Sequence, residues 1–199
     1  TPVVTVFDEK EKPDYEGNKK VIDFLIEGGV DGILVLGSSG EFTGLTKQEK
    51  HDFFKFYADY TAGRTKLYAG TGSLNFEDTV ALSNEMGYEG AMVIGPCYYA
   101  LDQEKIFVYY DTLAKSIKGN LYIYNFPARS GHSIAPETLK KLVENNTNIK
   151  GLKDSVSEPN HTNELMPLYD MDSNFSLLFK KLMQHRGVEV SDRAIFPYN

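Results

Sequence analysis

The sequence predicts an α/β fold of repeated strand–helix units, and two observations carry this prediction. Short aliphatic or β-branched runs recur along the 199 residues, and the segments between them have helical spacing. The runs are apolar on both faces, which is typical of parallel strands covered by helices. Two architectures fit such a pattern, an open doubly wound sheet and a (β/α)₈ TIM barrel.

Seven segments are expected to be strands. They cover residues 3–7, 32–36, 66–69, 90–94, 120–124, 148–153 and 175–179. An open doubly wound sheet usually has a glycine-rich nucleotide loop after its first strand. Here residues 8–13 are mainly charged and contain no glycine, which favours the barrel.

Three helices are expected from their apolar faces and end signals. A stripe of Val21, Phe24 and Leu25 ends at the glycines 28–29. Residues 46–49 form a capping box, and three phenylalanines follow it at positions 53, 54 and 56.

The third expected helix begins near Pro136, a residue suited to the first helical position. Its apolar face is expected to comprise Leu139, Leu142 and Val143. The asparagines 145–146 are expected to end it in left-handed geometry.

We assign residues 1–179 to the barrel and residues 180–199 to a C-terminal helical or tail fragment. A TIM barrel needs about 250 residues, and no eighth strand is recognisable here. Strand 8 and most of a C-terminal helical extension are therefore expected to be missing, and we expect the 199 residues to be ordered pieces of a longer protein.

Composition excludes several functional classes. The net charge of −7 argues against a nucleic-acid partner, and no apolar run is long enough to span a membrane. A lone cysteine, Cys97, allows no internal disulfide, so a cytoplasmic location is expected. The four histidines show no ligand spacing, and no nucleotide motif is present, so no metal and no nucleotide cofactor are expected.

Lys153 is the most informative candidate, because it stands in an apolar strand and a barrel site lies at the carboxyl ends of its strands. Alternation places it on one face with Ile149 and Gly151, where a desolvated neutral amine could attack a carbonyl and form a Schiff base. Gly151 would leave room beneath it. Taken alone, the spacing favours the plainer interpretation, a strand-end lysine that reaches solvent or pairs with Asp154.

Three further positions at the strand ends could do chemistry. Tyr124 could transfer protons, or be a core tyrosine. The turn with Ser38 and Ser39 could bind a carboxylate, or be an ordinary loop after a strand. Arg129 could hold a second carboxylate in a bidentate fork, or be a surface charge.

Three motifs together resemble the dihydrodipicolinate synthase and N-acetylneuraminate lyase family of class I aldolases. They are residues 37–41 (GSSGE), 124–131 (YNFPARSG) and 151–155 (GLKDS), in this order. The resemblance extends from Thr1 to about Phe179 and implies a (β/α)₈ barrel. It also implies a homotetramer or homodimer.

The resemblance implies a role for each candidate. Lys153 would form an imine with pyruvate, with no further cofactor, and Tyr124 would transfer protons above it. Ser38 would act as the relay hydroxyl and Tyr98 as the second tyrosine of the relay. Ser38 and Ser39 would bind the pyruvate carboxylate.

Arg129 favours the synthase branch, in which this position holds the carboxylate of aspartate semialdehyde. The leading hypothesis is thus a 4-hydroxy-tetrahydrodipicolinate synthase of lysine biosynthesis. Phe126 and Cys97 depart from common synthases, and Lys47 and Lys50 make feedback inhibition by lysine doubtful. A second hypothesis is a 2-keto-3-deoxy sugar-acid aldolase or N-acetylneuraminate lyase. A third is an inactive barrel that serves as a binding subunit.

Overall fold

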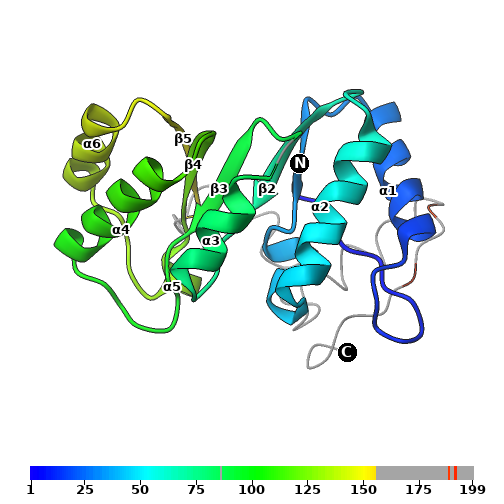
Figure 1. The fold of residues 1–199 in the computed structure, drawn as a ribbon, viewed down its shortest axis with the longest axis horizontal. Coiled ribbons are helices and arrows are strands. Elements are labelled where there is room, and N and C mark those ends of the chain that lie inside the picture. The colour runs from blue at the N-terminus through cyan, green and yellow to red at the C-terminus, as the bar shows by residue number, and fades with distance from the viewer. Residues whose placement is uncertain (86, 156–187, 189–190, 192–199) are drawn as a thin grey trace, which may run out of the picture. The chain divides into compact units, whose positions relative to one another are not determined.

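The computed structural model describes residues 1–85 and 87–155, together with residues 188 and 191. The chain divides into two compact units, one containing Thr1–Leu67 and the other Tyr68–Ser157. In the described residues, five parallel-sheet strands lie in sequence order from β1 to β5, with helices between successive strands. The strands β2 to β5 can be followed in Figure 1. In a doubly wound sheet, the strand order reverses at a switch point. The described strands show no such reversal.

The described part of the first unit carries two α-helices and the first strand. Its elements are α1 (Tyr15–Glu27), β1 (Gly32–Val35), the 3₁₀ turns η1 (Ser38–Gly40) and η2 (Phe42–Gly44), and α2 (Lys47–Thr61). The strand expected at residues 3–7 makes only isolated bridges, such as the parallel bridge between Pro2 and Leu34. The strand β1 ends one residue early, because Leu36 takes a left-handed backbone with φ 54°.

Helix α1 ends at Gly28 as expected, although its buried face differs from the predicted stripe. Val21 and Ile22 are fully buried, whereas Phe24 and Leu25 are only half-buried. Helix α2 begins with the expected capping box, and its buried residues include Phe53 and Phe54.

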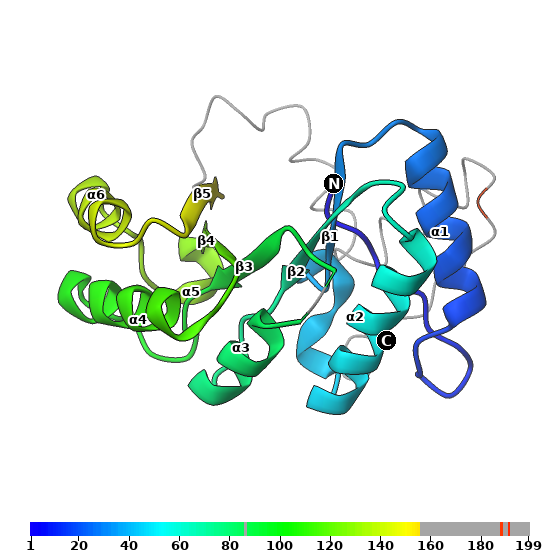
Figure 2. The ribbon, with the colours of Figure 1, turned by 45° about the horizontal axis from the view of Figure 1, so that its top comes forward.

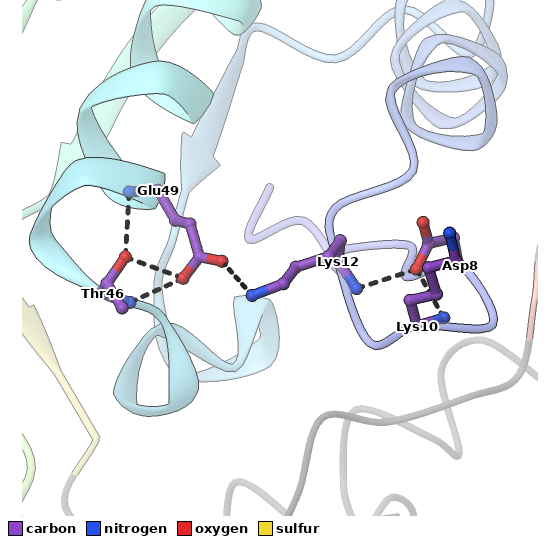
Figure 3. A network of polar contacts seen from close by, with 5 residues as sticks. All are labelled: Asp8, Lys10, Lys12, Thr46 and Glu49. Atoms are coloured by element: carbon purple, nitrogen blue, oxygen red, sulfur yellow. Dashed lines mark hydrogen bonds and ion pairs between the residues drawn. The ribbon is translucent and has the colours of Figure 1, made fainter.

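A polar network ties the N-terminal loop to the start of α2 (Figure 3). Asp8 accepts hydrogen bonds from the backbone N–H groups of Lys10 and Lys12, and the Lys12 amine forms a 2.7 Å ion pair with Glu49. Glu49 also closes the capping box by accepting from the backbone N–H of Thr46. The pKa of the Glu49 carboxyl is lowered, and the largest cause is the hydrogen bond from the Lys12 amine.

The second unit holds the larger part of the parallel sheet. Its elements are β2 (Lys66–Gly70), which starts in the first unit, α3 (Phe76–Ser83), β3 (Gly90–Ile94), α4 (Gln103–Ser116), β4 (Asn120–Asn125), α5 (Pro127–Ser130), α6 (Pro136–Asn145) and β5 (Ile149–Asp154). Figure 2 shows α4 and α6 side by side against the β3–β5 part of this sheet.

One face of this sheet packs into an aliphatic core beneath α4 and α6. Ala91, Val93, Leu121 and Ile123 come from the strands and are at most 1% exposed. They contact a buried helix side that includes Leu142 of α6. Burial of apolar area on this scale is the main stabilising term of the unit.

The end of α6 differs from the expectation. Pro136 does occupy the first turn, but Val143 is 48% exposed and does not belong to the buried face. Asn146 caps the helix in an extended conformation, not a left-handed one. Its side chain donates to the Leu142 carbonyl and to Asp111 of α4, which satisfies the helix end without a left-handed residue.

The expected strand at residues 175–179 and nearly all of the fragment 180–199 lie outside the described residues. In the described part of the chain, no helix is long and apolar enough to cross a membrane.

Candidate active site

Lys153 and Tyr124 occupy matching positions on neighbouring strands. The parallel register of β4 and β5 pairs Tyr124 with Lys153. The Lys153 amine lies 4.0 Å from the centroid of the Tyr124 ring, in a cation–π contact. Tyr124 is buried and Lys153 is half-buried. The structure therefore brings the two leading candidates together.

Two contacts that belong to the simpler alternatives, an ion pair between Lys153 and Asp154 and a hydrogen bond of the Tyr124 hydroxyl, are not made among the described residues. Asp154 accepts a 3.0 Å hydrogen bond from Asn125, and no carboxylate of the described residues forms an ion pair with Lys153. Within the described part of its unit, no hydrogen bond holds the Tyr124 hydroxyl. Phe126 stacks on the Tyr124 ring at 5.5 Å and fixes its plane.

The prediction that Ile149, Gly151 and Lys153 share one face is wrong for Ile149. A register shift lies between Leu121 and Tyr122, which pair with Ile149 and Gly151 respectively. Lys150 is the extra residue, so Ile149 joins Leu121 in the helix-side core. Alternation along the sequence could not reveal this irregularity.

The space left by Gly151 is filled by an aromatic ring. A β-carbon at Gly151 would lie 3.0 Å from Cδ1 of Tyr122. On the other side of that ring, a β-carbon at Gly90 would lie 2.9 Å from Cε2. Tyr68 meets Tyr122 edge-on at 5.2 Å. Gly90 and Gly151 thus leave the space that the Tyr122 ring fills, and we call this space the glycine slot. The pair Tyr122–Gly151 lies two residues before the pair Tyr124–Lys153 along the two strands.

Arg129 lies exposed on the four-residue helix α5, which directly follows β4. Pro127 opens this helix, and Gly131 closes it with a left-handed backbone. Ser130 fixes the turn, because its hydroxyl donates to the carbonyl of Phe126. Among the described residues, no carboxylate forms an ion pair with Arg129.

Tyr98 lies in the loop after β3 and is 77% exposed. Its ring meets that of Tyr99 edge-on at 4.9 Å, and the adjacent Cys97 is exposed and free. Among the described residues of the second unit, no hydrogen bond or ring contact joins Tyr98 to Tyr124 or Lys153.

Ser38 and Ser39 belong to the first unit, where they open the turn η1. Ser38 is exposed and Ser39 is buried. The hydroxyl of Thr5 donates to the Gly40 carbonyl at 2.8 Å and so anchors the turn to the N-terminal segment. The turn itself is held by hydrogen bonds from the Gly40 N–H to the Gly37 carbonyl and from the Glu41 N–H to the Ser38 carbonyl.

No group of His, Cys, Asp and Glu side chains among the described residues could hold a metal ion. The chemistry available to these residues is that of an amine beside a phenol. Asn125 belongs to the motif of residues 124–131, but no role was expected for it from the sequence. Its side chain is buried and bonds to two other segments, which only the folded structure reveals.

Comparison with known proteins identifies the chain. Residues 1–179 match the family described as the dihydrodipicolinate synthetase family. The chain belongs to this family. The predicted family and fold class are thereby confirmed, because solved members with the same strand–helix order superpose on it.

Two of its relatives carry different functional names. YagE of Escherichia coli K12, provisionally named a 2-dehydro-3-deoxy-D-gluconate aldolase, is 33% identical over 83% of this chain and 56% of its own length. The 4-hydroxy-tetrahydrodipicolinate synthase of Kosmotoga olearia is also 33% identical, over 83% of this chain and 57% of its own length. The chain thus spans little more than half the length of these relatives.

Solved structures agree on the fold. The crystal structure of YagE with pyruvate gives a TM-score of 0.93 at 24% identity, covering 100% of this chain and 91% of that one. Dihydrodipicolinate synthase of Aquifex aeolicus gives 0.76 at 33% identity, covering 79% of this chain and 55% of that one. The chain has the TIM-barrel fold of these relatives, and its described residues hold the strands β1 to β5 of that fold.

Proposed function

We propose that the whole protein is a Schiff-base-forming carbon–carbon lyase or synthase that uses pyruvate. The observation that carries this proposal is the Lys153 amine 4.0 Å from the Tyr124 ring on the adjacent strand. Membership of the dihydrodipicolinate synthetase family supports it, as does the pyruvate bound in the YagE crystal.

The proposed reaction begins at Lys153. Its neutral amine attacks the keto carbon of pyruvate, and loss of water leaves an imine. The imine withdraws electrons, so a proton leaves the adjacent methyl group and an enamine forms. The enamine carbon attacks an aldehyde carbon and makes the new carbon–carbon bond, while the aldehyde oxygen takes a proton. Hydrolysis of the imine then releases the product and restores Lys153.

The other predicted residues have assigned roles in this proposal. Tyr124 transfers the protons, and Ser38 and Tyr98 complete the relay. Ser39 binds the pyruvate carboxylate together with Ser38. Arg129 holds a carboxylate of the aldehyde partner. We further propose that the protein acts in the cytoplasm as a homotetramer or homodimer, with pyruvate and an aldehyde as its small-molecule substrates.

The aldehyde partner separates two versions of the proposal. The exposed guanidinium of Arg129, at the position that holds the semialdehyde carboxylate in the synthase branch, favours aspartate semialdehyde, and hence a 4-hydroxy-tetrahydrodipicolinate synthase of lysine biosynthesis. The name of YagE favours a 2-keto-3-deoxy sugar-acid aldolase. The inactive binding subunit is the third version, and it predicts no imine at all.

The test is borohydride trapping with pyruvate, followed by peptide mapping. We expect a reduced adduct on Lys153 and no adduct in the Lys153→Met variant. Among the described residues, the amine that contacts the Tyr124 ring is that of Lys153. A folded protein without an adduct would support the inactive version. Arg129→Ala then decides between the substrates. We expect at least a tenfold loss of semialdehyde turnover with trapping retained, whereas unchanged turnover would contradict the synthase assignment.

A further inference from the structure

Asn125 links three segments of the second unit through one buried side chain. It is the last residue of β4 and is 4% exposed. Its amide nitrogen donates to Asp154 of β5 at 3.0 Å, and its side-chain oxygen accepts from the backbone N–H of Ile134 at 3.2 Å. Its carbonyl accepts from the N–H of Ser155 at 2.8 Å.

The two partners of this side chain lie next to the proposed reacting groups. Asp154 follows Lys153, and Asn125 follows Tyr124, so the Asn125–Asp154 bond repeats the register that pairs the lysine with the tyrosine. Ile134 lies on the segment that leaves α5, the helix that carries Arg129. One carboxamide therefore fixes both the end of β5 and the chain beyond Arg129.

The chemical identity of the side chain is what this arrangement uses. The same carboxamide must donate to a carboxylate and accept from an N–H, and only an amide does both with fixed ends. An aspartate would keep the acceptor but would oppose the carboxylate of Asp154. An alanine would leave the partly buried N–H of Ile134 without this acceptor.

We propose that Asn125 is a positioning residue that holds Lys153 in register with Tyr124 through Asp154. This inference rests on the proposed imine chemistry of Lys153. Such chemistry is sensitive to small displacements, because a misplacement of about 1 Å can cost on the order of a hundredfold in rate. Loss of the bond should then slow imine formation without removing any reacting group.

The test exchanges the two partners in the whole protein. Asn125→Asp should slow trapping of pyruvate on Lys153 by about 10- to 100-fold, because two carboxylates would face each other. Adding Asp154→Asn restores a donor and an acceptor in reversed order, and should recover most of the trapping rate. A merely structural role of Asn125 would not predict recovery of rate by this second change.

Asp154→Ala removes the same hydrogen bond by changing its other partner. Because Asp154 is exposed, this variant should fold like the unaltered protein. We expect slower trapping there as well. The matched control is Asp111→Ala, which removes the chemically equivalent bond from Asn146, 2.9 Å long, between α6 and α4. Its trapping rate should equal that of the unaltered protein.

The outcomes separate this inference from the proposed function. An adduct in the unaltered protein, with unchanged rates in Asn125→Asp and Asp154→Ala, overturns the inference and leaves the proposed function standing. Slowing without recovery in the exchanged pair also overturns it. Absence of an adduct in the unaltered, folded protein overturns both.

Discussion

The two faces of the sheet in the second unit differ in what they carry. The helix-side face consists of small and aliphatic side chains such as Ala91, Val93 and Ile123, all buried. The opposite face carries two tyrosines, 122 and 124, and a lysine, with glycines beside them. Its side chains are mostly half-buried, although Tyr124 is buried.

If the proposed function holds, this difference teaches how one set of strands serves stability and chemistry at once. Apolar burial needs only volume and shape, so the helix-side face uses residues without polar atoms. Under the proposed function, the opposite face presents an amine and a phenol, which lie beside the packed Phe126 ring and the hydrogen bonds of Asn125. Substitutions on the two faces should therefore have different consequences.

The largest expected effect on stability is on the helix-side face. Ile123→Ala should lower the free energy of unfolding by about 2–5 kcal/mol, since the side chain is fully buried and its loss leaves a cavity. Chemical denaturation measures this change. Val108→Ala on α4 is the control, because Val108 is 56% exposed and should change stability by less than about 0.5 kcal/mol. Equal effects at the two sites would break the comparison.

A smaller effect is expected at the glycine slot of the opposite face. Gly151→Ala places a methyl group 3.0 Å from the Tyr122 ring and should cost about 1–3 kcal/mol through overpacking. A second change, Tyr122→Leu, should relieve the clash, so the double variant should be more stable than Gly151→Ala.

Gly119→Ala is the control for that slot, because nothing lies within 4 Å of the added β-carbon. A thermal melt of the variants measures these differences. If Gly151→Ala melts like Gly119→Ala, the slot is not filled as described.

The smallest effect on stability is expected at His132, which lies against Gly95 at the carboxyl end of β3. Burial lowers the pKa of His132 there, and its ring lies 3.1 Å from a β-carbon built on Gly95. The unfolded chain therefore binds the proton at higher pH than the folded one. Stability from the neutral ring is present above about pH 6.5 and is lost as the pH falls through the lowered pKa.

The loss should stay below about 1 kcal/mol, because the ring is only partly buried and solvent screens it. Denaturation at a series of pH values, compared between the unaltered protein and His132→Gln, measures it. We expect His132→Gln to lack this part of the acid loss. Parallel pH profiles of the two proteins would contradict the assignment.

Much of this fold follows from local sequence signals. The strands β2 to β5 come close to their predicted bounds, since each is a short apolar run between turns. The capping box at Thr46 and the proline at the start of α6 appear as predicted, because helix ends depend on a few neighbouring residues. The motif around Lys153 likewise indicated the family before any geometry was known.

The sequence by itself determined the strand–helix order, the family and the candidate lysine and tyrosine, because periodicity and motifs are local properties of the chain. The tertiary structure decided which side chains meet. The extra residue Lys150 turns Ile149 to the other face, Tyr122 occupies the space that Gly151 leaves, and Asn125 bonds across to Asp154. These facts depend on strand register, which is fixed by packing and hydrogen bonding between segments far apart in the sequence.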